Sequence, residues 1–157
     1  MIAVNRLIQS KRAMKNYCYR DDIAIADAAF DAWADSPEEL FRAAVEATTG
    51  VMIDNPSSIS CVQRINISLE SPDIEMLLFR LLDEIVYYKD AESLLLLASH
   101  LLIKHSGEDW ALEGELEGEK IDPSKHDMVV DVKAVTLHRF SVMESEGGWK
   151  ATVVLDI

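Results

Sequence analysis

The chain has 157 residues, of which 49% are apolar, and its formal net charge is −13. This length and this apolar content fit one folded domain with its own core, and they exclude global disorder. Residues 1–20 contain five of the 15 basic side chains and no acid, so the rest of the chain is more acidic still and repels the phosphates of nucleic acid. We therefore expect no sequence-specific nucleic-acid binding. A cation, a basic protein partner or simple solubility explains the acidity better.

The cysteines and the apolar runs indicate a cytoplasmic protein. Cys18 and Cys61 form neither a CxxC pair nor a disulfide framework, and no signal peptide precedes them. The longest apolar run, residues 94–103, is too short to span a membrane. Residues 1–16 are basic and lack strand alternation, so we expect a poorly ordered arm before a single domain at 17–157. Homo-oligomerisation is left open.

The first elements expected are two strands and a helix. Residues 17–19 and 28–34 read as strands. Ser36 then supplies a helix N-cap and Pro37 occupies the first helical position. Apolar residues follow at helical spacing until Pro56, which cannot continue the helix.

A strand and a second helix come next. Residues 59–69 alternate between apolar and polar positions, which predicts a strand. Ser71 and Pro72 repeat the cap-plus-proline start signal, and an apolar stripe from Ile74 to Tyr88 predicts the helix.

The second half of the chain reads mainly as strands. Residues 94–103 and 110–121 flank Gly107 and predict a strand pair, in which the acidic, glycine-spaced segment 114–119 forms a solvated edge. Alternation over 128–142 predicts another strand.

A turn at residues 144–148 connects that strand to one that ends at Ile157, which places Asp156 roughly opposite Thr136. Strands outnumber helices and follow no βαβ rhythm. The fold class predicted is therefore α+β, a two-layer arrangement of a mostly antiparallel sheet packed with two α-helices.

Several carboxylates are candidates for binding a cation. Asp156 and the carboxylate of Ile157 lie one residue apart, and clustered oxygens suit a divalent cation such as Ca²⁺, Mg²⁺ or Mn²⁺. An exposed acid at the end of a terminal strand is the alternative. Asp27 interrupts an apolar stretch, where it could also cap a turn.

Three basic or titratable side chains are weaker candidates. Lys133 is a charge in mid-strand, and it either faces solvent or pairs with a carboxylate or phosphate. His126 and His138 could titrate near neutrality, although single histidines are more often structural than ligands. No metalloprotease, Walker, serine-hydrolase or dinucleotide motif is present in the sequence.

Three blocks of the sequence resemble the archease family. They are AFDAWADSPEELFRAA with the preceding Asp27, the segment 72–90, and Lys125-His126 with DVKAVTLH and the closing GGWKATVVLDI. The resemblance covers residues 17–157. It implies metal ligands at Asp27, Asp156 and the carboxylate of Ile157, and a functional lysine at Lys133.

The resemblance also implies a function in tRNA splicing. Archeases are non-enzymatic activators of the RtcB-type RNA-splicing ligase, whose guanylylation and multiple turnover they promote. One departure is Ala24-Ile25, where many members have His-Thr. The alternatives are a general chaperone or assembly factor and a metal-dependent hydrolase, for which no general base or nucleophile is evident beside the carboxylates.

Overall fold

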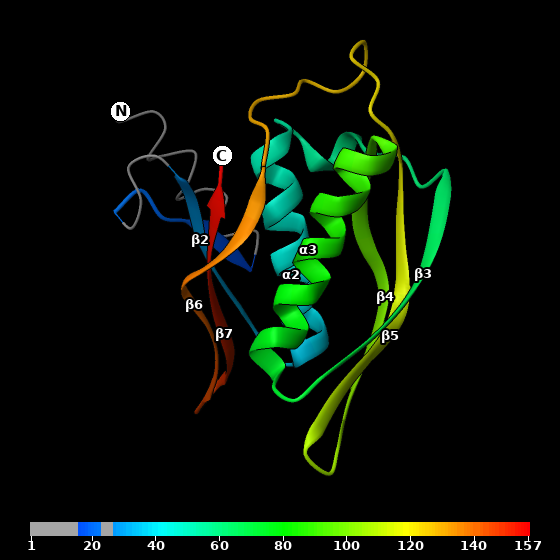
Figure 1. Ribbon diagram of the computed structural model, residues 1–157. Helices are drawn as coiled ribbons and strands as arrows, with labels where there is room; N and C mark the ends of the chain where they lie inside the picture. Colours follow the sequence, from blue (N-terminus) through cyan, green and yellow to red (C-terminus); the bar gives the residue numbers. More distant parts are fainter. Residues whose placement is uncertain (1–15, 23–26) are drawn as a thin grey trace.

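The computed structural model describes residues 16–22 and 27–157, and it places two helices between two antiparallel sheets (Figure 1). The strands are β1 (Tyr17–Tyr19), β2 (Asp27–Ala34), β3 (Gln63–Ser71), β4 (Leu94–Ser106), β5 (Asp109–Lys120), β6 (Ala134–Ser145) and β7 (Gly148–Asp156). The helices are α2 (Pro37–Met52) and α3 (Ile74–Glu92), with a short 3-10 turn, η1 (Pro56–Ser58), after α2.

The strands divide into a four-stranded sheet, β1-β2-β7-β6, and a three-stranded sheet, β3-β5-β4. Every strand pair is antiparallel. The α+β class, the antiparallel pairing and the two helices are thus confirmed. The strands form two sheets rather than one, and both helices contact both sheets, so a helical layer lies between two sheet layers (Figure 1).

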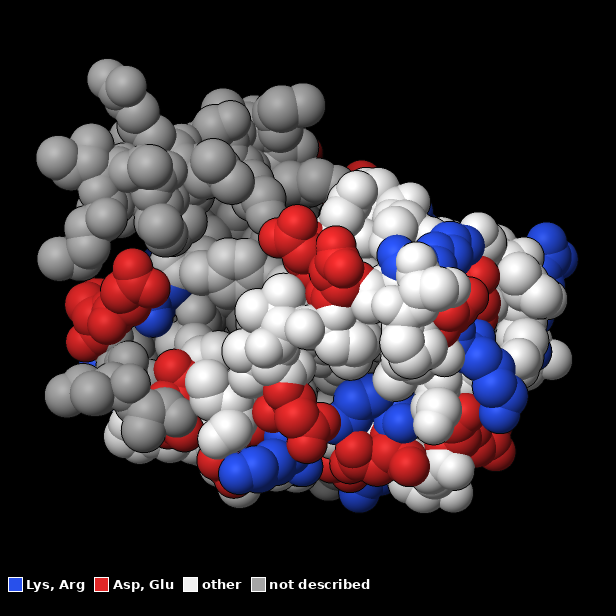
Figure 2. All heavy atoms as spheres, turned by 90° about the horizontal axis from the view of Figure 1, so that it is seen from above, with Lys and Arg blue, Asp and Glu red and all other residues white. Residues whose placement is uncertain are grey.

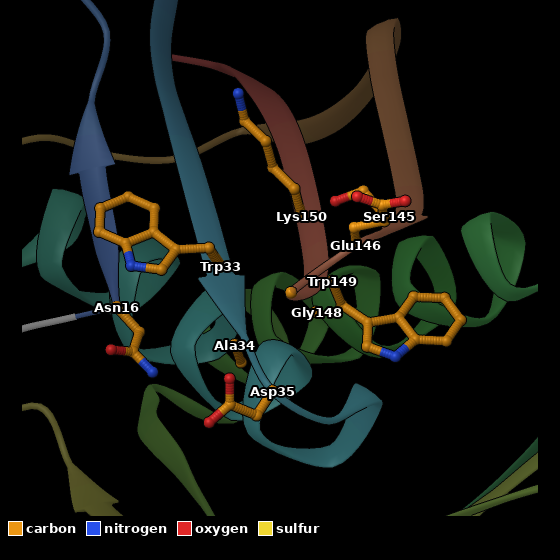
Figure 3. A pocket seen from close by; sticks show the side chains of 10 residues that line it. Asn16, Trp33, Ala34, Asp35, Ser145, Glu146, Gly148, Trp149 and Lys150 are labelled. Atoms are coloured by element: carbon orange, nitrogen blue, oxygen red, sulfur yellow. The ribbon is translucent and has the colours of Figure 1, made fainter.

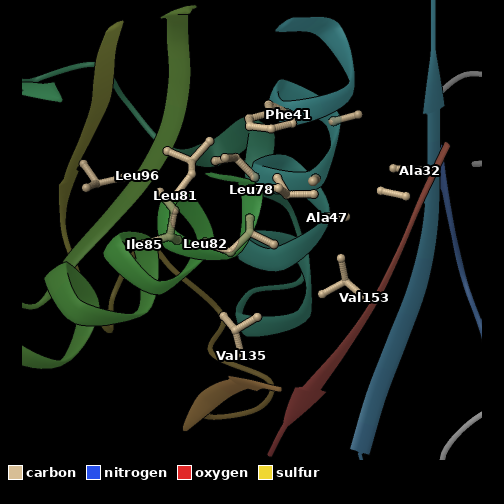
Figure 4. Packing of buried hydrophobic residues seen from close by; sticks show 14 of the residues in the cluster. Ala32, Phe41, Ala47, Leu78, Leu81, Leu82, Ile85, Leu96, Val135 and Val153 are labelled. Atoms are coloured by element: carbon tan, nitrogen blue, oxygen red, sulfur yellow. The ribbon is translucent and has the colours of Figure 1, made fainter. Parts of the chain in front are cut away.

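This position between sheets explains why the helices are buried on more than one face. The predicted stripe of α2 is buried at Phe41, Ala44 and Val45, but Leu40 and Ala47 on other faces are buried too. In α3 the additional buried apolar residues are Leu82 and Val86. Figure 4 shows Ala47 on the side of Ala32 and Val153, whereas Leu81 lies on the side of Leu96. Full burial of one such leucine contributes about 2 kcal/mol.

The two helix starts differ in how well the sequence predicted them. Ser36 caps α2, where its hydroxyl accepts a hydrogen bond from the Glu39 N–H at 3.2 Å. The N-cap of α3 is Asp73, whose carboxylate accepts from the Met76 N–H at 2.7 Å. The predicted cap at Ser71 is therefore wrong, because Ser71 still belongs to β3 and the helix begins two residues later, where Asp73 accepts the capping bond.

The acidic segment 114–119 is not an edge, because β5 is the central strand of its sheet. Gly118 is required there, since a Cβ at this position would lie 1.8 Å from the Leu95 carbonyl oxygen. The glutamates of β5 alternate with buried Leu112 and Leu116, so they occupy the face turned away from the helices.

The strand predicted over residues 128–142 begins later, at Ala134. Residues 121–133, which we call the crossover segment, carry the chain from β5 to β6 over the ends of both helices (Figure 1). Met128 forms an isolated bridge with Ile53, and the Val129 N–H donates to the Met52 carbonyl at 2.8 Å. These contacts to α2 replace the strand pairing that the alternation suggested.

The β6–β7 hairpin contains a bulge between Thr136 and Ser141. Between these two positions the chain advances five residues along β6 but only two along β7, and Arg139 within the bulge adopts a φ of 53°. Asp156 consequently pairs with Ala134 rather than near Thr136 as predicted.

No helix within residues 16–22 and 27–157 is long and apolar enough to cross a membrane. The expected arm, apart from Asn16, and the Ala24-Ile25 departure lie outside the described residues.

Candidate functional site

Asp27 and Asp156 lie directly opposite each other at one end of the four-stranded sheet. They are Cα partners in the antiparallel pair β2–β7. Directly opposed residues point to the same side of a sheet, and the alternate positions Phe30 and Leu155 face the core. Both carboxylates therefore project from the outer face, where Asp27 is half-buried and Asp156 is exposed.

Ile157 follows Asp156, and the Ile157 side chain packs against the hydrophobic core. This contact holds the end of β7 in place and brings the carboxylate of Ile157 to the same end of the sheet as Asp27. Among the described residues, no three His, Cys, Asp or Glu side chains are arranged to hold a metal ion. A cation at this end of the sheet would need the carboxylate of Ile157 together with the two aspartates. All three are the hard oxygen ligands that Ca²⁺ and Mg²⁺ prefer.

Lys133 also reaches this end of the sheet, although not from mid-strand. It precedes β6, and its backbone N–H donates to the Asp156 carbonyl at 2.8 Å. The side chain of Lys133 is exposed. The contact with Asp156 is thus made by the backbone, which leaves the ammonium group at the surface.

His126 is held inside the fold by hydrogen bonds at both ring nitrogens. Its side chain is fully buried, its Nδ1 accepts from the Asp122 N–H at 2.9 Å, and its Nε2 lies 2.8 Å from Glu119 Oε1. Hydrogen bonds from Lys125 Nζ, the Ser60 N–H and His126 lower the pKa of Glu119 to about 2.

His138 is exposed within the bulge of β6, away from the Asp27–Asp156 pair in register. The structure does not bring the two histidines together with the candidate cation ligands.

A buried carboxylate that sequence reasoning missed lies farther along the same outer face. Asp31 accepts from Thr152 Oγ1 and from Arg20 Nη1, each at 2.7 Å, and Lys150 Nζ lies 3.8 Å away. The signal available in the sequence was the spacing of Asp27 and Asp31, which lie four residues apart and therefore on the same face of a strand. Because its oxygens are already paired, Asp31 serves to hold β1 and β7 against β2.

One hollow formed by described residues lies away from the carboxylates. Its volume is about 360 Å³, and it lies at the opposite end of β2 and β7, beside the β6–β7 turn. Figure 3 shows Trp33 and Lys150 on one side of the sheet and Trp149 on the other. Trp149 meets Trp110 edge-on with ring centroids 6.4 Å apart. The hollow shares no residue with the candidate cation site.

The charges around the crossover end are mixed. Figure 2 views the molecule from this end and shows acidic and basic side chains interspersed among uncharged ones on its described part. The net negative charge is thus not gathered into one broad patch there, and the Asp27–Asp156 pair is distinguished by its geometry rather than by a general acidic field.

Two helices between antiparallel sheets define a small α+β domain, whose candidate site is a pair of carboxylates at the end of one sheet. Residues 17–157 match the model of the Archease protein family. The chain belongs to this family.

Relatives from archaea support the assignment over most of the chain. The archease of Methanopyrus kandleri is 33% identical over 132 residues, which cover 84% of this chain and 94% of the relative. The archease of Pyrococcus furiosus is 34% identical over 133 residues, covering 84% and 93%.

Two solved structures share the fold. The solution structure of Methanobacterium thermoautotrophicum protein 1598 has a TM-score of 0.79 at 31% identity, covering 92% of this chain and 100% of that one. The crystal structure of an archease from Thermotoga maritima, described as a possible chaperone, has a TM-score of 0.55 at 16% identity. It covers 88% of this chain and 96% of its own, and at that identity it supports the fold alone.

Proposed function

We propose that this protein is a non-catalytic activator of an RtcB-type RNA-splicing ligase, and that it acts with a divalent cation held by Asp27, Asp156 and the carboxylate of Ile157. The observation that carries the proposal is the β2–β7 register, which sets the two aspartates opposite each other beside the chain end. Membership of the archease family supports the ligase as partner. The proposed effect is faster guanylylation of the ligase and multiple turnover in tRNA splicing.

The geometry suits a surface that presents a cation to a partner. Asp156 is exposed and Asp27 is half-buried. A cation bound by three carboxylates keeps open positions, because Ca²⁺ takes six to eight oxygen ligands. Lys133 adds an exposed ammonium group beside this surface. In this proposal it contacts a carboxylate or phosphate of the partner complex.

The test is RNA ligation with substrate in excess over the ligase, in the presence and absence of this protein. Activation that is lost with Asp156→Asn supports the proposal. Asp109→Asn is a matched control, since it removes one exposed acid at the start of β5. Unchanged multiple-turnover ligation with the ligase from the same cell would contradict the proposed function.

A general chaperone is the second candidate. Large apolar side chains are exposed at Val129 (61%), Leu137 (62%) and Met143 (62%), and such groups bind unfolded chains. The Thermotoga maritima archease is also described as a possible chaperone. Suppression of aggregation of unrelated proteins, at substoichiometric amounts and without any effect on the ligase, would favour this function.

A further inference from the structure

Lys89 is a buried charge that the proposed function does not use. It lies in the last turn of α3, and its side chain is only 4% exposed. Its ammonium group donates to the Asp131 carboxylate, to Asp90 Oδ1 at 2.7 Å and to the Val132 carbonyl at 2.6 Å. Burial alone would lower the pKa of Lys89, but the hydrogen bonds to Asp131 and Asp90 outweigh it and raise the pKa. The group is therefore charged and fully engaged.

Two of these contacts fix the crossover segment where it approaches β7. Asp131 and Val132 belong to that segment, whereas Asp90 belongs to α3 itself. In Figure 1 the segment passes over the end of α3 before it becomes β6. Lys89 thus fastens the last residues of the crossover to a rigid helix.

The fastened peptide group is the one that contacts Asp156. The Val132 carbonyl and the Lys133 N–H belong to one planar peptide unit. Its carbonyl accepts from Lys89 Nζ at 2.6 Å, and its N–H donates to the Asp156 carbonyl at 2.8 Å. A charged donor on the carbonyl polarises the unit and strengthens the N–H as a donor.

The Asp156 carbonyl is in turn part of the peptide that joins Asp156 to Ile157. Two of the proposed ligands, the carboxylates of Asp156 and Ile157, belong to the residues that this peptide joins. We propose that Lys89 is a positioning residue, which holds the Asp156–Ile157 peptide, and with it the two carboxylates, in the orientation that binds the cation. The inference rests on the proposed cation site. Partners behind the ligands of a metal site commonly alter its affinity by about 10- to 100-fold.

The test compares Lys89→Met, Asp131→Asn and Asp90→Asn in the full chain. Lys89→Met keeps the apolar stem and removes the charge. Asp131→Asn is a milder variant, because that side chain is 70% exposed. Asp90→Asn is its matched control, since it also removes one acidic partner of Lys89 but leaves the crossover segment untouched.

Two readouts are measured for each variant. The first is the rate of hydrogen exchange of the Lys133 amide without added metal. Core amides in α2 serve as the reference, because a general loss of stability speeds their exchange as well, whereas a local loss does not. The second is Ca²⁺ affinity by calorimetry. We expect Lys89→Met to speed exchange at Lys133 selectively and to weaken Ca²⁺ binding on the order of tenfold. We expect Asp131→Asn to do the same more weakly and Asp90→Asn to do neither.

Exchange at Lys133 that rises only in proportion to that of the core, or unchanged Ca²⁺ affinity in Lys89→Met, would overturn the positioning role. Failure of the proposed function looks different. In that case the unmodified protein binds no Ca²⁺ or leaves the ligase unaffected, while the exchange measurement still reports whether Lys89 holds the Lys133 amide.

Discussion

Asp27 and Asp156 form a directly opposed pair of like charges across β2 and β7. Such a pair destabilises a sheet by about 0.2–1 kcal/mol unless something compensates the charge. We predict that Asp156→Asn raises the free energy of unfolding of the metal-free protein by about that amount. If the proposed site binds Ca²⁺, the unmodified protein is stabilised by Ca²⁺ and this variant should lose that stabilisation. Urea unfolding with and without Ca²⁺ measures both effects.

Asp109→Asn is the control for a general change in net charge, because it removes an exposed acid from the other sheet. It should leave the response to Ca²⁺ unchanged. If Asp156→Asn instead destabilises the metal-free protein and keeps the full response to Ca²⁺, the two opposed carboxylates do not form a cation site.

The side chain and the backbone of Lys133 have separable roles. The backbone N–H donates to Asp156, whereas the ammonium group is exposed. Lys133→Ala should therefore leave Ca²⁺ affinity and the free energy of unfolding within about 0.5 kcal/mol of the unmodified values. If the side chain contacts the ligase as proposed, activation should fall severalfold. Lys104→Ala, an exposed lysine on β4, is the control. Full activation by Lys133→Ala would remove this side chain from the proposed contact.

Local signals predicted the elements better than they predicted how the elements are joined. The Ser36 cap and the apolar stripe of α2 depend on neighbours in sequence, and the structure confirms both. Alternation over 128–142 resembled one strand, but the backbone of Val129 bonds to Met52 of α2 and that of Val132 to Lys89 of α3 instead. No periodicity in the sequence encodes such contacts.

The candidate site was predictable in part for the same reason. The proximity of Asp156 to Ile157 is visible in the sequence, whereas the pairing of Asp27 with Asp156 depends on the order of strands in the sheet. The bulge in β6 shifts the residue opposite Asp156 from the neighbourhood of Thr136 to Ala134, and no signal in the sequence marks this bulge. The Lys89 contacts join α3 to a segment 42 residues away in sequence, and nothing local marks them.

Ser71 and Asp73, near the start of α3, should affect stability in opposite directions. Among the described residues, the Ser71 hydroxyl is buried without a hydrogen-bond partner, while Asp73 caps the helix. Removal of an unpaired buried hydroxyl relieves a desolvation cost, so Ser71→Ala should raise the free energy of unfolding by up to about 1 kcal/mol. Asp73→Ala should lower it by about 1 kcal/mol through loss of the cap. Urea unfolding of both variants measures these changes. If Ser71→Ala lowered the free energy of unfolding and Asp73→Ala did not, Ser71 would be the cap instead.

Glu119 makes stability depend on acid pH. Hydrogen bonds from Lys125, Ser60 and His126 lower its pKa from 4.5 to about 2 in the folded protein. A lowered folded-state pKa means that the stabilisation is fully present above about pH 4.5 and is lost as the pH falls towards 2. Glu119→Gln should therefore be less stable than the unmodified protein at pH 7, and the difference should shrink between pH 4.5 and 2.

The measurement is urea unfolding at a series of pH values, with Glu113→Gln as the control on the same exposed face of β5. Other acids titrate in both proteins and cancel in the difference. A difference for Glu119→Gln that stays constant down to pH 2 would show that the charge of the Glu119 carboxylate does not stabilise the fold.

An addition to the chain end tests the third proposed ligand. Two glycines after Ile157 would carry the terminal carboxylate about 7 Å along the strand direction, whereas Ca²⁺ binds oxygen at about 2.4 Å. The Ile157 side chain would still pack against the core. We expect Ca²⁺ affinity to fall by about tenfold or more, while the free energy of unfolding without metal stays within about 0.5 kcal/mol. The same two glycines added before Met1 should change neither quantity. Unimpaired Ca²⁺ binding by the extended chain would leave the two aspartates as ligands and exclude the carboxylate of Ile157.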